Sequence, residues 1–183
     1  MRNGLILLLA AVLTLAFVGS KISAATALNA PAPDISAERW INSKPLNWDT
    51  LKGKVVIVEF WTFGCHNCRN VEPYVKSWYQ KYRTKGLEVV AVHSPEFDHE
   101  RNFDNVRDYV KEHAITYPVA IDNDFTIWRR FANRYWPAMY IVDKTGVIRY
   151  RFIGEGRYNK IENVLQTLLA DKVSDSGQVV GLR

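Results

Sequence analysis

Cys65 and Cys68 are the only cysteines of the 183-residue chain, and two residues separate them. In front of them, the run Val55–Trp61 is rich in β-branched and aromatic residues and is followed by a break at Gly64, which is typical of a buried strand. Behind them, apolar residues recur at helical spacing, at Val71, Tyr74, Val75 and Trp78. The two thiols are therefore predicted to lie where a strand passes into the first turn of a helix.

A cysteine at the start of a helix is a candidate nucleophile. The unpaired N–H groups and the dipole at that end stabilise an anion, and the thiolate is the form of cysteine that attacks disulfides. The i,i+3 spacing puts both sulfurs on one face of the helix, within reach of a disulfide. We assign Cys65, at the helix start, as the attacking thiol and Cys68, one turn further, as the resolving thiol.

Half of a zinc site is the structural alternative for this pair of cysteines. Zinc needs about four ligands, and the sequence would usually supply a second C-x-x-C or a histidine pair. There is no second cysteine pair, and His93, His99 and His113 are spread over separate predicted elements, where we interpret them as structural or surface residues. The pattern favours dithiol redox chemistry with no metal and no cofactor.

The N-terminal sequence indicates export. Arg2 precedes an apolar run at Leu5–Val18, and small residues with the spacing of a cleavage site follow at Ser23–Ala27. The run is shorter than the roughly 20 residues of a membrane-spanning helix. Residues 1–25 are therefore predicted to be a signal peptide or, alternatively, an uncleaved anchor with Arg2 inside. The expected location is the periplasm or the outer face of the cytoplasmic membrane.

Composition excludes several other classes of protein. The chain that remains after residue 25 is long enough to form one hydrophobic core that needs no disulfide or metal site for stability. Both cysteines belong to one motif, so no framework of structural disulfides is available. The formal net charge is +5, but the basic residues are scattered and form no long run. Nucleic acid is therefore not an expected partner, and contact with a membrane is expected only through the possible N-terminal anchor.

Beyond about residue 30, predicted strands and helices alternate. Strands are expected at Arg39–Ile41, Val55–Trp61, Leu87–His93, Pro118–Ile121, Ala138–Val142 and Val147–Ile153, and helices from the cysteines to about Arg83, at Phe125–Asn133 and at Lys160–Ala170, with an amphipathic stretch at His99–His113. This order predicts one α/β domain, residues 30–172, built around a mixed sheet. Residues 173–183 are expected to be a flexible tail.

Several linked motifs resemble one family. The stretch Glu59–Cys68 resembles the thioredoxin active site and, more narrowly, that of exported TlpA/ResA-like thiol–disulfide oxidoreductases and of the thioredoxin-like domain of DipZ-type proteins. Pro73 matches the kink of the family's active-site helix. Ile115–Asp122 is similar to the segment after the helical insertion of TlpA-like proteins, and Tyr135–Asp143 is similar to the cis-proline strand. The resemblance implies a thioredoxin-like α/β/α sandwich that carries this insertion.

Glu59 interrupts an otherwise apolar strand six residues before Cys65, at the position of the buried acid of thioredoxin. A carboxyl group under the disulfide would lose hydration, so its pKa would rise and it could exchange a proton with Cys68. The alternative is a side chain that reaches solvent near the strand end. We favour the buried interpretation, because central strands of this class are covered on both faces.

The resemblance also implies further site residues. In such folds the bond before the proline, here Trp136–Pro137, is cis and its loop lies against the disulfide, where the backbone of Trp136 can pair with an extended substrate segment. Trp61 and Trp136 are candidates to wall the thiol site. His66 either favours the Cys65 thiolate when protonated or is a solvated side chain. Relatives often have a small or apolar residue there, so the redox poise stays open.

The predicted function is enzymatic thiol–disulfide exchange with protein disulfide substrates. The resemblance implies a reductant that is recharged by a membrane thiol electron carrier and serves cytochrome c maturation or envelope redox homeostasis. A thiol peroxidase is one alternative, because Thr62 and Cys65 form a T-x-x-C motif, but Val58 stands where a peroxiredoxin has proline. A copper or zinc carrier is another. However, copper carriers of this fold space their cysteines differently and place a histidine near the cis-proline.

Overall fold

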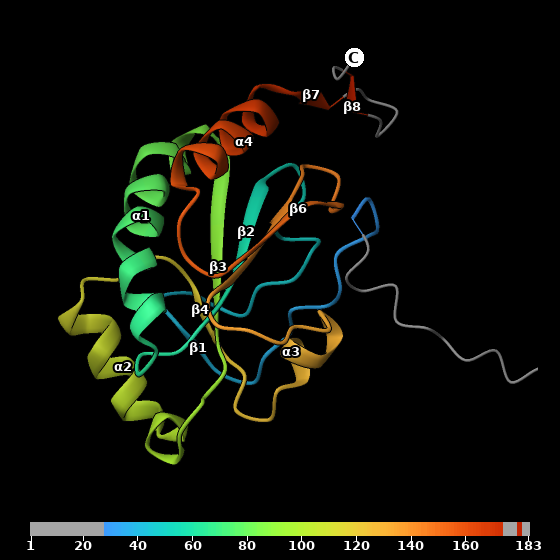
Figure 1. Cartoon of the computed structure of the whole chain (residues 1–183). Coiled ribbons are helices and arrows are strands. Elements are labelled where there is room, and N and C mark those ends of the chain that lie inside the picture. The colour runs from blue at the N-terminus through green and yellow to red at the C-terminus, as the bar shows by residue number, and fades with distance from the viewer. Residues whose placement is uncertain (1–27, 174–178, 181–183) are drawn as a thin grey trace, which may run out of the picture.

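The computed structural model describes residues 28–173 and 179–180; the predicted signal peptide, residues 1–25, lies outside the described residues. A six-stranded sheet of order β1-β4-β3-β2-β5-β6 forms its centre (Figure 1). Its strands are β1 (Trp40–Ile41), β2 (Val55–Trp61), β3 (Leu87–His93), β4 (Val119–Ile121), β5 (Ala138–Val142) and β6 (Ile148–Ile153). Because β2, β3 and β4 run parallel while β1, β5 and β6 join antiparallel, the sheet is mixed, as predicted.

Helices cover both faces of this sheet (Figure 1). They are α1 (His66–Tyr82), α2 (Phe103–Glu112), α3 (Thr126–Arg130) and α4 (Tyr158–Ala170), with short 3₁₀ helices η2 (Arg83–Lys85) and η3 (Asp98–Arg101). Buried side chains of α1, α2 and α4 join one apolar cluster, and those of α3 and of the segment before β2 join another. The predicted thioredoxin-like α/β/α sandwich is confirmed.

The central strand β2 leads directly to the cysteines. All seven of its residues are buried. Side chains alternate between the faces of a strand: Val55, Ile57 and Trp61 lie in the cluster under α1, which also contains Cys68, whereas Val56, Val58 and Phe60 lie in the opposite cluster. Glu59 therefore points to the face that α1 covers.

The predicted helical insertion lies between β3 and β4. The amphipathic stretch at His99–His113 is not one helix, because the extended residue Asn102 separates η3 from α2. The Asn102 side chain accepts the backbone N–H groups of Asp104 and Asn105, which caps α2 at its N-terminus. The insertion therefore presents a 3₁₀ turn and a helix to the start of α1.

The predicted tail, residues 173–183, is described only in part. Val173 pairs with Val179, and Lys172 with Val180, in an antiparallel pair of short strands, β7 (Lys172–Val173) and β8 (Val179–Val180). The remainder of the predicted tail lies outside the described residues, so its flexibility stays a prediction. Within the described part of the chain, no helix combines the length and hydropathy needed to cross a membrane.

Candidate active site

Cys65 and Cys68 form a disulfide at the start of α1, with their Cα atoms 5.3 Å apart. Cys65 is the extended N-cap residue of the helix, and its Sγ accepts the backbone N–H of Cys68 at 3.2 Å. Cys65 is half-buried, whereas Cys68 is only 4 % exposed. The sulfur at the helix start is thus the one that an incoming group can reach.

The local electrostatics favour an anion on the outer sulfur. A reduced Cys65 would lie at the positive end of a long helix, with an N–H group already directed at it. The first turn of α1 holds His66, Asn67 and Arg69 beside Cys68, and none of them is acidic. His66 is exposed, so its side chain lies in solvent. The arrangement suits attack by Cys65 and later closure by Cys68.

The predicted cis-proline loop lies at the end of β2 that leads to the dithiol. Ala138 pairs with Phe60, which places Pro137 next to the end of β2. The Trp136–Pro137 bond is cis, as predicted. The indole Nε1 of Trp136 donates to the carbonyl of Ser94 at 3.0 Å, and the half-buried ring packs against the apolar cluster that contains Cys68.

Two aromatic rings lie below the loop that carries Cys65. Trp61 is 5 % exposed and belongs to the same cluster as Cys68. Its ring meets that of His93 edge-on, with centroids 5.2 Å apart. His93 is fully buried, with a ring nitrogen 3.2 Å from the hydroxyl of Thr62. Burial lowers the pKa of His93 to about 4, so the ring is neutral, which fits the structural role predicted for it.

Glu59 is buried, as predicted, with 3 % of its surface exposed. Burial raises the pKa of its carboxyl group to about 8, and the negative charge of Glu72 adds to this rise. Near neutral pH, Glu59 therefore holds a proton that it can lose when conditions change slightly. Such a group on the same face as Cys68 is suited to proton exchange.

Glu72 is a site residue that the sequence did not reveal. It lies on α1 one turn after Cys68 and is 8 % exposed. Its carboxylate accepts hydrogen bonds from the Nζ of Lys76 at 2.8 Å and from the hydroxyl of Tyr109 at 2.9 Å. It also lies 3.2 Å from Nδ1 of His113. It fastens the insertion helix α2 to α1 and places a second acid near Glu59.

Glu100, in η3, is the other residue that the sequence did not reveal. Its side chain is fully buried. One carboxylate oxygen accepts the backbone N–H of Gly64 at 2.9 Å, and the other accepts those of Glu96 at 2.5 Å and Phe97 at 2.9 Å. An acid of the insertion therefore contacts the residue that immediately precedes Cys65.

Replacing Glu59 by glutamine is expected to change how stability depends on pH. The pKa of Glu59 is higher in the folded protein than the ordinary value of 4.5. The wild-type protein therefore loses stability as pH rises from about 4.5 through about 8, by up to about 5 kcal/mol. In urea unfolding of the oxidised proteins, Glu59→Gln should be a few kcal/mol more stable than wild type at pH 9, with little difference at pH 4.5.

The matched control is Glu38→Gln, which makes the same change on an exposed residue. It should follow the wild-type curve at both pH values, because solvent already hydrates that carboxylate. If Glu59→Gln also follows the wild-type curve, the carboxyl group of Glu59 does not have the raised pKa that its proposed role requires.

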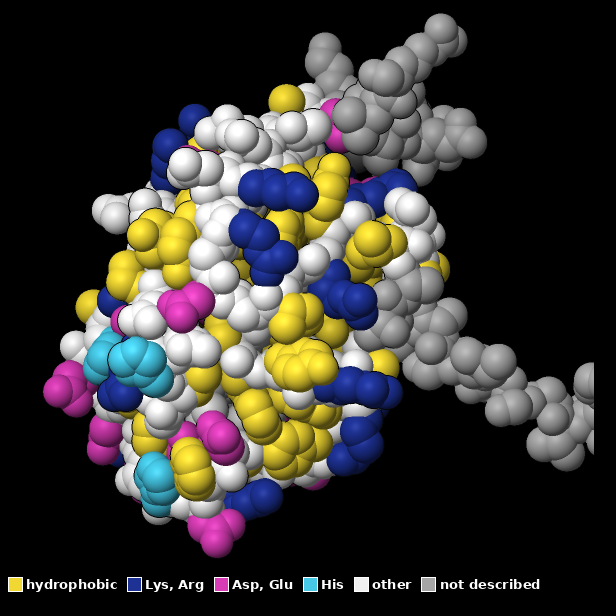
Figure 2. All heavy atoms as spheres, in the orientation of Figure 1, with side chains coloured by type: hydrophobic (Ala, Val, Ile, Leu, Met, Phe, Trp, Pro, Cys, Tyr) yellow, Lys and Arg dark blue, Asp and Glu magenta, His cyan; other side chains and the backbone are white. Residues whose placement is uncertain are grey.

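Exposed aromatic side chains lie in two segments at the disulfide end of the sheet. Phe97 and Tyr135 are 52 % and 57 % exposed. Behind Tyr135, the ring of Trp136 lies 4.3 Å from that of Trp128 and 6.5 Å from that of Phe125, measured between centroids. In the view of Figure 2, hydrophobic side chains gather in the lower part of the molecule, with lysine and arginine side chains along their right border. Such a surface suits a polypeptide better than a small polar molecule.

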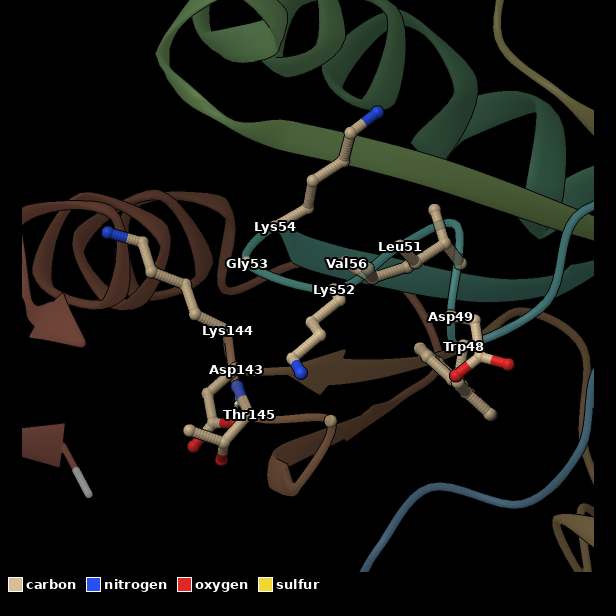
Figure 3. Close-up of a pocket in the computed structure, with 11 residues that line it drawn as sticks. Trp48, Asp49, Leu51, Lys52, Gly53, Lys54, Val56, Asp143, Lys144 and Thr145 are labelled. Atoms are coloured by element: carbon tan, nitrogen blue, oxygen red, sulfur yellow. Dashed lines mark hydrogen bonds between the residues drawn. The ribbon is translucent and has the colours of Figure 1, made fainter. Parts of the chain in front are cut away.

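A separate cavity of about 470 Å³ lies at the opposite end of β2. Its walls include Trp48, Leu51 and Lys52 before the strand and Asp143 and Lys144 after β5 (Figure 3). The Nζ of Lys144 donates to backbone carbonyls near the end of α4. This cavity has no contact with the cysteines.

Among residues 28–173 and 179–180, no three side chains of metal-ligating type come together.

Comparisons with known proteins agree with this geometry. Residues 28–151 match the AhpC/TSA family. The thiol–disulfide oxidoreductase YkuV of Bacillus subtilis is 31 % identical over 145 residues, which cover 79 % of this chain and 97 % of that protein. A solved structure of a thioredoxin-like protein in the oxidised form is 32 % identical, with a TM-score of 0.72, and covers 79 % of this chain and 98 % of that one. The resemblance inferred from the motifs is confirmed.

The protein DipZ of Mycobacterium bovis shares more residues but is much longer. It is 42 % identical over 144 residues, which cover 76 % of this chain and 21 % of DipZ. The chain thus spans about a fifth of the length of this curated relative.

Proposed function

Because this chain belongs to the AhpC/TSA family, and within it to thioredoxin-like thiol–disulfide oxidoreductases, we propose that it reduces disulfide bonds in exported proteins through Cys65 and Cys68. One observation carries the proposal: a disulfide at a helix start joins a reachable sulfur, which accepts a backbone N–H, to a buried one. This arrangement gives the two thiols different roles.

The reaction begins with the dithiol form of the protein. The Cys65 thiolate attacks one sulfur of the substrate disulfide, which forms a mixed disulfide and releases the other substrate sulfur as a thiolate that takes up a proton. The Cys68 thiol then loses its proton, and its sulfur attacks Sγ of Cys65. The second substrate thiolate leaves, so two electrons have passed to the substrate and Cys65–Cys68 is oxidised.

Glu59 acts in the second half of this cycle. Cys68 is buried and needs a local acceptor for its proton, and the ionised Glu59 carboxylate on the same face can supply one. In the reverse direction the protonated acid returns the proton to Cys68. With a pKa of about 8, Glu59 is mostly protonated at neutral pH and can donate its proton, while the minor ionised fraction, which grows as pH rises towards 8, can accept one.

Substrate segments bind along the cis-proline loop. The backbone of Trp136 pairs with an extended segment next to the target disulfide, and the rings of Trp61 and Trp136 wall the site. His66, exposed on the first turn of α1, contributes positive charge near Cys65 when it is protonated. The exposed aromatic residues Phe97 and Tyr135 support a polypeptide as the substrate.

The proposal includes a place for the reaction and a source of its electrons. The segment at 1–25 supports export to the periplasm or to the outer face of the cytoplasmic membrane. A reductant there must be recharged from inside the cell, which calls for a membrane thiol electron carrier. Cytochrome c maturation and envelope redox homeostasis are the processes that such a reductant would serve. A fusion of residues 1–27 to alkaline phosphatase should be active, and an inactive, correctly produced fusion would contradict export.

Reduction of insulin tests the activity, and equilibration with glutathione tests its direction. The reduced protein should cleave insulin disulfides catalytically in the presence of dithiothreitol, and its dithiol–disulfide equilibrium should correspond to a potential below that of the glutathione buffer. A potential near that of a strong oxidant would contradict the role of reductant. Rapid consumption of hydrogen peroxide by Cys68→Ser, without insulin reduction by the wild type, would indicate a peroxidase instead.

A further inference from the structure

Glu100 connects the insertion to the active-site loop, the segment that carries Gly64 and Cys65. It belongs to η3, thirty-five residues beyond Cys65, and its carboxylate accepts the N–H of Gly64 at 2.9 Å. The same carboxylate accepts the N–H groups of Glu96 and Phe97, so both of its oxygens are used. These contacts leave the side chain little freedom, because each atom that it can offer as an acceptor already has a donor.

Close packing fixes the position of Gly64 against this carboxylate. A Cβ atom at position 64 would lie 2.2 Å from Oε1 of Glu100, so any side chain there would displace the carboxylate. Gly64 is followed at once by the N-cap residue Cys65, whose N–H donates to the carbonyl of Thr62 at 3.3 Å. The bond from Gly64 to Glu100 therefore helps to set where the attacking sulfur lies relative to the helix.

The carboxylate is charged as well as buried. Burial acts to raise the pKa of Glu100, but the hydrogen bonds from Phe97, Thr62, Glu96 and Gly64 outweigh it, and the pKa lies below its ordinary value. A negative charge is thus hydrogen-bonded to the backbone of the residue that immediately precedes Cys65. A carboxylate close to a thiol disfavours the thiolate, because like charges repel.

We propose that Glu100 is a positioning residue that holds the backbone of Gly64 and Cys65 and, through its negative charge, disfavours the Cys65 thiolate, which shifts the dithiol–disulfide equilibrium towards the disulfide. This inference rests on the proposed function: an equilibrium shifted towards the disulfide means that the dithiol gives up its electrons more readily, which makes the protein a better reductant. The helix start stabilises the thiolate, and Glu100 offsets part of that effect. The insertion thereby tunes the redox chemistry of the domain.

Other charged groups near the loop do not supply this effect. His93 of β3 is neutral, with a pKa of about 4 set by burial. Glu59 and Glu72 lie on the side of Cys68, and the carboxylate of Glu72 is paired with Lys76 at 2.8 Å. His66 is exposed to solvent, and a positive charge there would favour the thiolate rather than oppose it. Among the described residues, Glu100 is therefore the acid joined directly to the backbone that bears Cys65.

The test measures two properties of Cys65 in Glu100→Gln, which keeps the shape of the side chain and removes its charge. The pKa of Cys65, from the pH dependence of its alkylation by iodoacetamide, should fall by about one unit. The equilibrium constant with glutathione should shift about tenfold towards the dithiol, which corresponds to a rise of about 30 mV in potential. Glu100→Asp keeps the charge but shortens the reach to Gly64, so it should slow alkylation while its equilibrium stays nearer to that of the wild type.

Asp143→Asn is the matched control. Asp143 is 3 % exposed and accepts the N–H groups of Thr145 at 2.8 Å and Val147 at 3.1 Å, but it lies in the turn after β5, at the far end of the sheet. Its replacement should lower stability to a similar degree and leave the pKa of Cys65 and the glutathione equilibrium unchanged. Equal shifts in both variants would reduce Glu100 to a general structural role and overturn the proposal.

Gly64→Ala gives a second, independent variant where Glu100→Gln does not fold. The added methyl group displaces the carboxylate without altering any charge, so the pKa of Cys65 should again fall. Wild-type values in both Glu100→Gln and Gly64→Ala would overturn the inference. Because these measurements need no protein substrate, a wild type that fails to reduce insulin while the variants shift as expected would reject the proposed function and leave the role of Glu100 standing.

Discussion

The Cys65→Ser protein is expected to reduce insulin at least about a thousandfold more slowly than the wild type. Serine keeps the size and the N-cap position of the side chain, but a hydroxyl group is a weak nucleophile at its ordinary pKa and cannot form the mixed disulfide. Cys68 cannot take over the attack, because it is 4 % exposed and an incoming disulfide does not reach it. The rate of insulin precipitation with dithiothreitol measures the loss.

The control for this variant is its stability. The Cys65–Cys68 disulfide closes only a short loop, so it restricts the unfolded chain little and its loss should change stability little. Urea unfolding should therefore resemble that of the reduced wild-type protein. A folded Cys65→Ser protein that keeps more than about a tenth of the activity would show that another group attacks the substrate.

Cys68→Ser should stop the cycle at a different step. Cys65 still attacks, so the first turnover proceeds, but no second sulfur releases the mixed disulfide. Without dithiothreitol, a covalent complex with insulin in a one-to-one ratio should accumulate, whereas with dithiothreitol, whose thiols can release the complex, insulin reduction should continue but more slowly than with the wild type. Non-reducing electrophoresis and mass spectrometry of the trapped species measure this outcome.

The two serine variants control each other. Substrate should be trapped by Cys68→Ser and not by Cys65→Ser. If the complex instead forms in Cys65→Ser, the roles of the two cysteines are reversed, and the difference in their burial does not decide which sulfur attacks.

The strands of the sheet could be predicted because a buried strand has a continuous run of apolar residues in the sequence. Val55–Trp61, Leu87–His93 and Ala138–Val142 are apolar runs with sharp ends, and the structure has strands at these bounds. Helix ends were less accurate. The helix predicted at Phe125–Asn133 spans Thr126–Arg130, because Phe125 and Ala132 take left-handed conformations that helical periodicity does not reveal.

The dithiol and its acid could be predicted because their chemistry is local. Cys65 and Cys68 lie three positions apart, and Glu59 precedes them on the same strand, so strand and helix geometry alone places all three on one face of the sheet. The only further information that the prediction needed was that these residues are buried, and the apolar neighbours of Glu59 indicated this.

Glu100 and Glu72 could not be predicted, because their partners are distant in the sequence. Glu100 lies in a charged, amphipathic stretch whose pattern does not single it out, and a 3₁₀ turn directs its carboxylate to Gly64. Glu72 meets Tyr109 and His113 only when α2 packs on α1. Contacts of this kind depend on how the insertion folds back on the active-site helix.

Alkylation of the reduced protein by iodoacetamide, followed against pH and located by peptide mass, tests the central claim most directly. Cys65 should react selectively, with a pKa below the free-thiol value of about 8.5, while Cys68 stays unmodified in the folded protein. Equal labelling of both cysteines, or a Cys65 pKa at or above that of a free thiol, would contradict the assignment of Cys65 as an activated nucleophile.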